Sequence, residues 1–126
     1  MFQAIDHLER AGASYDSAYS TVIGRGAAYM RAQRHALTLV NGELYRSERD
    51  LLDPEGLPKR QWFKSTMYAT GLYTGFGGDP LPGVGQEIDD RDARGAASEA
   101  AKVARAVDRM AQRAERTTKL LRDLPQ

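Results

Sequence analysis

Residues 51–88, with the sequence LLDPEGLPKRQWFKSTMYATGLYTGFGGDPLPGVGQEI, decide how the rest of the chain must be arranged. The stretch contains four of the five prolines, seven of the twelve glycines and the single tryptophan. Because proline and glycine interrupt regular helices, no helix can continue through it. The sequence on both sides is rich in Ala, Arg, Leu and Glu and is typical of helix. The pattern therefore predicts a small helical protein with one long, irregular, aromatic-rich loop.

Apolar residues on both sides of this loop recur at spacings of three and four, which is the period of one helix face. Gly24 and Gly26 predict the end of the first helix or a turn. Asp53-Pro54 predicts the end of the second, because proline disfavours the helical conformation of the residue before it. The stripes are Ile5, Leu8, Gly12, Tyr15, Tyr19 and Val22; then Leu37, Val40, Leu44, Glu48 and Leu51; then Ala100, Val103, Val107, Met110, Ala114, Thr117, Leu121 and Leu124.

The loop itself predicts only short elements. Pro54-Glu55-Gly56 predicts a tight turn, because proline presets φ and glycine tolerates the backbone conformation at the end of such a turn. Residues 62–69 are β-prone and are expected to run extended, and residues 83–90 predict one short helical turn. The last helix is expected to begin near residues 89–92, where acidic side chains suit the positive end of the helix dipole.

We therefore expect a single all-α domain over residues 1–126, an up-and-down bundle of about four helices with the long loop before the last one. The apolar stripes are rich in Ala and Gly, which lets helices approach closely but leaves little large apolar area on each. Such a chain is expected to complete its core against another copy or another domain. Core and dimer surface are expected to share the last helix, through Val103, Val107, Met110, Ala114 and Leu121.

Composition excludes several classes of protein. Apolar content of 41%, charged content of 28% and a formal charge of +1 are ordinary for a soluble domain. The absence of cysteine excludes disulfides and thiol chemistry. No apolar run approaches the twenty or so residues of a membrane span, and residues 1–12 lack the pattern of a secretion signal. The compartment stays open.

No catalytic or metal-binding set is expected in this chain. His7 and His35 are predicted on different helices with no ligand partner at i+3 or i+4, and Asp79 stands alone, so no zinc site is expected. No histidine lies near Ser65 or Thr66 in the sequence, so no nucleophilic triad is expected. TGFGGDP lacks the lysine of a phosphate-binding loop.

A basic excess at the C-terminal end raises nucleic acid as a possible partner. Residues 91–126 contain nine Lys or Arg and five Asp or Glu. This pattern is typical of a solvated helix face, so we expect no nucleic-acid partner. A basic helical nucleic-acid binder stays open as the weaker alternative.

The loop aromatics allow two interpretations. Packing of Trp62, Phe63, Tyr68 and Phe76 against the helices is expected to anchor the loop in a small satellite core. Alternatively, some of them face a partner surface, where Trp and Tyr bury a large area around a polar group.

The sequence of the loop resembles the C-terminal dimerisation domain of transferrin receptors and glutamate carboxypeptidase-like zinc peptidases. A helix ends in a charged pair and Asp-Pro, Gly-Leu-Pro and an aromatic pair come next, and a Tyr-Ala strand leads to a Tyr-x-Gly loop and a Pro-Gly helix start. Here these elements are Glu48-Arg49, Leu51-Leu52-Asp53-Pro54, Gly56-Leu57-Pro58, Trp62-Phe63, Tyr68-Ala69, Tyr73-Thr74-Gly75 and Pro82-Gly83.

This resemblance implies a helical domain that follows a zinc peptidase-like catalytic domain and forms a symmetric homodimer. It also implies that the loop at Tyr73 and Gly75 reaches toward the active site, with the Tyr73 hydroxyl contacting a substrate carboxylate. Three departures put that acidic specificity in doubt. Leu72 and Ser65 stand where the carboxypeptidases have lysine and histidine, and the loop is three residues longer within 77–81.

Two hypotheses result, and they are compatible in a longer protein. The first is a non-catalytic homodimerisation domain, with no catalytic residue, metal or cofactor in this chain and zinc only in an absent catalytic domain. The second is a contribution of Tyr73 to a substrate pocket that a catalytic domain completes. Because the resemblance begins almost at residue 1, the chain is expected to be a piece of a longer protein.

Overall fold

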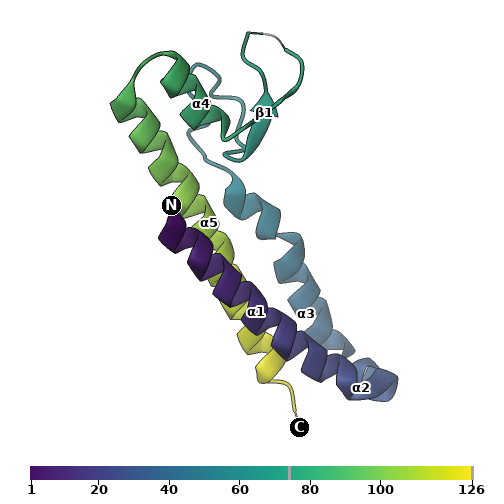
Figure 1. The fold of residues 1–126 in the computed structure, drawn as a ribbon. Coiled ribbons are helices and arrows are strands. Elements are labelled where there is room, and N and C mark those ends of the chain that lie inside the picture. The colour runs from purple at the N-terminus through teal and green to yellow at the C-terminus, as the bar shows by residue number, and fades with distance from the viewer. Residues whose placement is uncertain (74, 126) are drawn as a thin grey trace.

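The computed structural model describes residues 1–73 and 75–125, and it is helical as predicted (Figure 1). A two-stranded antiparallel sheet is the one β-sheet among these residues. In chain order the elements are α1 (Phe2–Gly24), α2 (Gly26–Ala32), α3 (Arg34–Tyr45), the 3₁₀ helix η1 (Ser47–Leu51), β1 (Tyr68–Thr70), β2 (Gly78–Pro80), α4 (Pro82–Asp89) and α5 (Ala93–Arg122).

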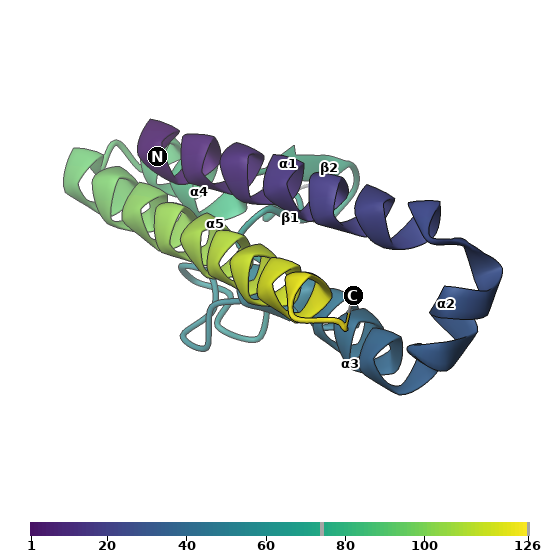
Figure 2. The same ribbon diagram turned by 90° about the horizontal axis from the view of Figure 1, so that it is seen from below.

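The helix α5 is the central element of the molecule, because α1, α3, η1 and α4 all pack on it. Its 30 residues extend for about 45 Å at the usual helical rise. Helix α1 packs along it in the same direction, whereas α3 and η1 pack on it in the opposite direction. Helix α4 covers its N-terminal end, and α2 connects the C-terminal end of α1 to the N-terminal end of α3, at the lower end of the molecule in Figure 1 and at the right in Figure 2. The up-and-down arrangement is therefore built on three long passes of the chain.

Small side chains let α1 and α5 approach closely. Ala11 and Ala18 of α1 and Ala106 and Ala111 of α5 are all buried. At the lower end, larger side chains fill the space between the helices. This core consists of Ala18, Val22, Val40, Leu121 and Leu124, and Tyr15, Tyr19, Tyr29, Met30, Ala36 and Leu37 pack against it.

The second apolar stripe was predicted to lie on one helix, but the structure divides it between α3 and η1. Gly26 adopts a φ of +85°, which a side chain would disfavour, and the short α2 turns the chain toward α3. Residues 47–51 then form a 3₁₀ helix, and Leu52 is extended. The Ser47 hydroxyl donates to the carbonyl of Leu44 (2.6 Å), a group that a continuing α-helix would use for its own backbone. Arg109 of α5 then holds the end of the segment by donating hydrogen bonds to the carbonyls of Asp50 (2.8 Å) and Leu52 (3.0 Å).

The loop is more compact than the sequence suggests. In the sheet, Tyr68, Ala69 and Thr70 pair with Pro80, Asp79 and Gly78. Only the end of the segment predicted to be extended, residues 62–69, belongs to this sheet. The predicted short helix is present as α4, with Pro82 at its first turn, where a missing N–H costs nothing.

The start of α5 is confirmed. Asp92 caps the helix, and its Oδ1 accepts hydrogen bonds from the backbone N–H groups of Arg94 (3.0 Å) and Gly95 (2.9 Å). The first helix likewise ends at Gly24, where the glycine pair predicted a break.

Candidate functional site

Ion pairs attach the start of the loop to α5. Lys102 Nζ lies 2.9 Å from Glu99, 3.2 Å from Glu55 and 3.4 Å from Asp53. The pKa of Lys102 is raised above its ordinary value, chiefly by the hydrogen bond to Glu99. Asp53 also accepts from the N–H of Glu55 (3.0 Å), which closes the predicted turn. The Asp-Pro-Glu-Gly motif therefore has a structural role in this chain, because it forms a turn and attaches the loop to α5.

The aromatic residues of the loop are mostly at the surface. Trp62 is 74% exposed, Tyr68 60% and Phe76 86%. The expectation that they anchor the loop in a satellite core is therefore wrong for Trp62 and Phe76. The reason is local, because the backbone bonds and ion pairs of residues 53–66 already fix the loop without them. Phe63 is half-buried beneath the Arg60 guanidinium, whose Cζ lies 5.5 Å from the ring centroid, and Tyr68 packs over Gly78.

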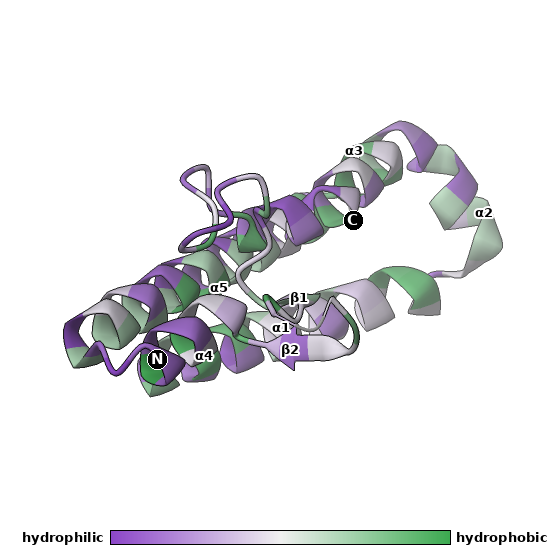
Figure 3. Cartoon of the chain, turned by 90° about the horizontal axis from the view of Figure 1, so that it is seen from above, coloured by the Kyte–Doolittle hydropathy of each residue, from purple (hydrophilic) through white to green (hydrophobic). Residues whose placement is uncertain are grey.

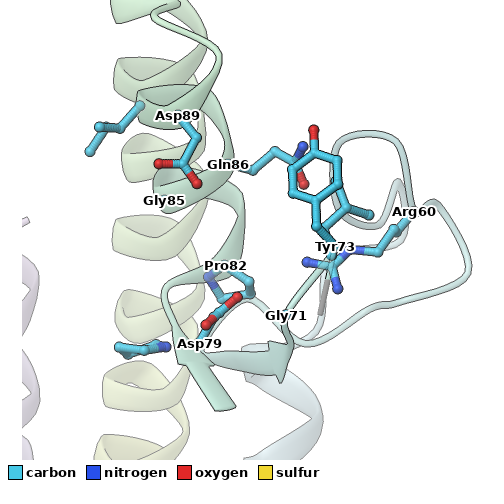
Figure 4. A pocket seen from close by; sticks show the side chains of 11 residues that line it. Arg60, Gly71, Tyr73, Asp79, Pro82, Gly85, Gln86 and Asp89 are labelled. Atoms are coloured by element: carbon cyan, nitrogen blue, oxygen red, sulfur yellow. The ribbon is translucent and has the colours of Figure 1, made fainter. Parts of the chain in front are cut away.

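Tyr73 lies at the open edge of a hollow between the loop and α4. The hollow has a volume of about 390 Å³, and Tyr73 itself is 76% exposed. Gly75, the other candidate of this motif, has a φ of +66° and open space around it. Figure 4 shows the Tyr73 ring between the side chains of Gln86 and Arg60. The hydroxyl of Tyr73 is therefore available to a ligand or a neighbouring domain.

Two of the groups that line this hollow are buried polar side chains. Arg60 is 5% exposed and Gln86 is 7% exposed. Neither was a candidate from the sequence. An arginine after Gly-Leu-Pro and a glutamine on a short helix carry no local signal of burial.

A second hollow, a groove of about 830 Å³, lies between the outer faces of α3 and α5. Leu39, 53% exposed, and Leu120, 38% exposed, are its large apolar residues. Figure 3 shows hydrophilic and hydrophobic residues alternating along both helices, as amphipathic helices require. The remaining lining residues are Thr38, Gly42, Glu43, Arg46, Arg116, Lys119 and Asp123.

The apolar face predicted on the last helix lies against the interior of the chain. Val103, Val107 and Leu121 are buried inside the chain, and Met110 and Ala114 are half-buried. Within a single chain these residues pack in the core. Leu120, next to the stripe, is the large apolar side chain of α5 that is exposed, and the helical period offered no reason to select it.

His7 makes contacts that its sequence neighbours did not predict. Its Nδ1 lies 2.6 Å from Asp108 and its Nε2 lies 3.0 Å from Glu115, both on α5. Within residues 1–73 and 75–125, no group of three His, Cys, Asp or Glu side chains is arranged to hold a metal ion. No helix in this part of the chain is long and apolar enough to cross a bilayer.

Comparison with known proteins identifies the family. The sequence model of the transferrin receptor-like dimerisation domain matches residues 1–115, which is most of the chain. The chain belongs to this family. The match spans α1, the loop with its Asp-Pro and Gly-Leu-Pro motifs, α4 and most of α5.

A curated relative points in the same direction. A probable glutamate carboxypeptidase of Arabidopsis thaliana is 37% identical over 51 residues, which is 40% of this chain and 8% of that protein. The aligned region is thus a small part of a much longer protein.

Proposed function

We propose that the chain is a non-catalytic homodimerisation domain of a glutamate carboxypeptidase-like zinc peptidase. Membership of the dimerisation-domain family carries the proposal. Its physical support is the distribution of apolar surface. Among the described residues, the largest fully buried side chains are only Val40 and Thr117, while several large apolar side chains of α3 and one of α5, Leu120, are exposed to solvent. A domain with so thin a core gains stability by covering such surface with a partner.

The groove between α3 and α5 is the face that we assign to the second copy. Its residues form two parallel stripes, one at residues 39, 42 and 46 and the other at 116, 119, 120 and 123. Residues at these spacings share one helix face. Gly42 leaves room for a side chain of the partner beside Leu39 and Leu120.

The charges around this groove are suited to self-association. Glu43 and Asp123 supply negative charge, and Arg46, Arg116 and Lys119 supply positive charge. In a two-fold dimer the same patch meets itself, so a patch with both signs can pair its charges across the axis. A stable dimer buries about 800 Å² per partner, roughly a tenth of the 8296 Å² surface of this chain.

Sedimentation equilibrium or light scattering over about a hundredfold range of concentration tests the proposal. We expect a mass of two chains for the unmodified protein and dissociation in the double variant Leu39→Asp, Leu120→Asp. Ile23→Asp is the matched control, because Ile23 is 47% exposed on α1, and it should leave the dimer intact. A monomer at every concentration contradicts autonomous dimerisation, and dissociation by Ile23→Asp alone contradicts the assigned face.

A second candidate function rests on the exposure of Tyr73. We infer that its hydroxyl contributes to a substrate pocket that a catalytic domain completes. In the full-length peptidase, Tyr73→Phe should raise KM for a carboxylate-bearing substrate and leave the dimer mass unchanged. An unchanged KM rejects this role and leaves dimerisation as the function of the chain.

A further inference from the structure

A groove of about 590 Å³ lies between the start of α1 and the middle of α5, two helices that run side by side in Figures 1 and 2. Arginines line both of its walls, Arg10 on α1 and Arg105 and Arg109 on α5. The groove shares no lining residue with the one between α3 and α5. Its other lining residues are Met1, Gln3, Ala4, His7, Ala104 and Asp108.

The one carboxylate among these lining residues is engaged by other groups. Asp108 Oδ1 lies 2.6 Å from His7 Nδ1, and Asp108 Oδ2 accepts a hydrogen bond from Gln112 (2.9 Å). Three guanidinium groups and one carboxylate leave a net charge of +2 on the lining, before any proton on the His7 ring is counted. The groove therefore attracts anions.

Two of the three guanidinium groups are not used by the fold. Among the residues that the structure describes, the side chains of Arg10 and Arg105 form no hydrogen bond or ion pair, and both residues are exposed. The acidic residues next to Arg10 on α1, Asp6 and Glu9, do not line the groove. A guanidinium keeps its charge and offers five N–H donors, so these donors are available to an anion from solution.

The third guanidinium is held in place by the protein. Arg109 Nε and Nη2 donate to the carbonyl of Asp50 (3.2 and 2.8 Å), and Nη2 also donates to that of Leu52 (3.0 Å). Because Arg105 and Arg109 are four residues apart on α5, their Cβ atoms lie about 6 Å apart on one helix face. A group that is already fixed loses less side-chain entropy when a ligand binds.

We propose that this groove binds a small anion of the diphosphate class. Guanidinium groups bind phosphate oxygens through charge-assisted, often bidentate hydrogen bonds. Because the arginines approach from both walls, two linked phosphoryl groups can contact more of them than one phosphate can. The volume of about 590 Å³ lies within the range of small-molecule sites. The proposal depends neither on dimerisation nor on any role of Tyr73.

A ligand series tests the charge requirement. The purified chain is titrated with pyrophosphate, orthophosphate and ADP by isothermal calorimetry and two-dimensional NMR, at constant ionic strength because salt screens exposed charges. Saturable binding of pyrophosphate is expected, with orthophosphate at least about tenfold weaker, as for the loss of one hydrogen bond to a charged group. ADP that binds as tightly as pyrophosphate indicates an organic diphosphate, and weaker binding of ADP indicates the inorganic one. Equal affinity for phosphate and pyrophosphate, or no saturable binding, overturns the proposal.

Variants locate the binding in the groove. Arg10→Met and Arg105→Met each remove one guanidinium, from opposite walls, and each should weaken pyrophosphate binding by about tenfold. Arg94→Met is the matched control, because Arg94 is exposed on α5 outside the lining and its loss removes the same charge. The control should bind pyrophosphate like the unmodified chain. An equal loss in Arg94→Met, or unchanged binding by both groove variants when NMR shows them folded, overturns the proposal.

Discussion

His7 on α1 and Asp108 on α5 lie 2.6 Å apart, measured from Nδ1 to Oδ1, although 101 residues separate them in the chain. The other ring nitrogen lies 3.0 Å from Glu115. A neutral imidazole carries only one N–H, so both carboxylates receive a hydrogen bond only from the protonated ring. The hydrogen bonds to Glu115 and Asp108 accordingly raise the pKa of His7 above 6.5.

This pair makes the stability of the α1–α5 contact depend on pH. A pKa raised by folding stabilises the folded state fully below 6.5, and the stabilisation is lost as the pH rises through the raised pKa. Urea unfolding at a pH below 6.5 and at an alkaline pH should therefore show a lower midpoint at the alkaline pH. His7→Gln should flatten that difference. His35→Gln, at an exposed position of α3, should retain it, and the idea fails if both variants behave like the unmodified protein.

Replacement of Arg113 should loosen α3 and η1 from α5. Arg113 Nε lies 2.5 Å from Asp50 and its Nη1 2.6 Å from Glu43, and its side chain is 16% exposed. Arg113→Met removes the cation that Asp50 and Glu43 share, although Glu43 retains its contact with Arg46 (3.3 Å). We expect a loss of about 1–3 kcal/mol in the free energy of unfolding, since partial exposure limits the effect.

Arg105→Met is the control for this measurement, because Arg105 lies on an exposed position of the same helix. Chemical denaturation should show little change for it. An equal loss in both variants would mean that the ion pairs of Arg113 add nothing specific.

A pair of glycine substitutions separates backbone strain from helix propensity. Gly56 has a φ of +78°, and a Cβ there would collide with the backbone of Gln61. Gly56→Ala should cost roughly 1–3 kcal/mol or more. Gly12 lies within α1 with no atom near its missing Cβ, so Gly12→Ala should stabilise by about 0.5–1 kcal/mol. Thermal unfolding measures both, and shifts of the same sign would contradict the distinction.

The N-cap of α5 gives a fourth prediction. Asp92→Ala removes the acceptor of two backbone N–H groups and should cost about 1 kcal/mol. Asp16→Ala, at an exposed position within α1, removes a carboxylate without a capping role and should be nearly neutral. Hydrogen exchange at residues 94–96 should accelerate only in the first variant, and unchanged exchange there would reject the cap.

Much of the fold was readable from local patterns. The glycine pair near residue 24 ends α1, Asp92 starts α5, and Pro82-Gly83 opens α4, because capping and φ restrictions act between neighbours in the chain. The second stripe was misleading, since its period continued through residues 47–51, whereas the structure has a 3₁₀ helix there and Arg109 of α5 binds the carbonyls of Asp50 and Leu52. The period of a helix face depends on nearby residues and could not reveal this contact with a distant helix.

The candidate sites likewise combine features that neighbouring residues determine with features that only tertiary packing determines. The sequence by itself determined the helical class, the long loop and the family motif within it, all of which depend on residues close together in the chain. Only the tertiary structure decided that His7 meets Asp108, that Trp62 lies in water, and that arginines of α1 and α5 line one groove. Burial and pairing depend on which elements pack together, and that packing results from the summed contacts of the whole chain rather than from any single segment.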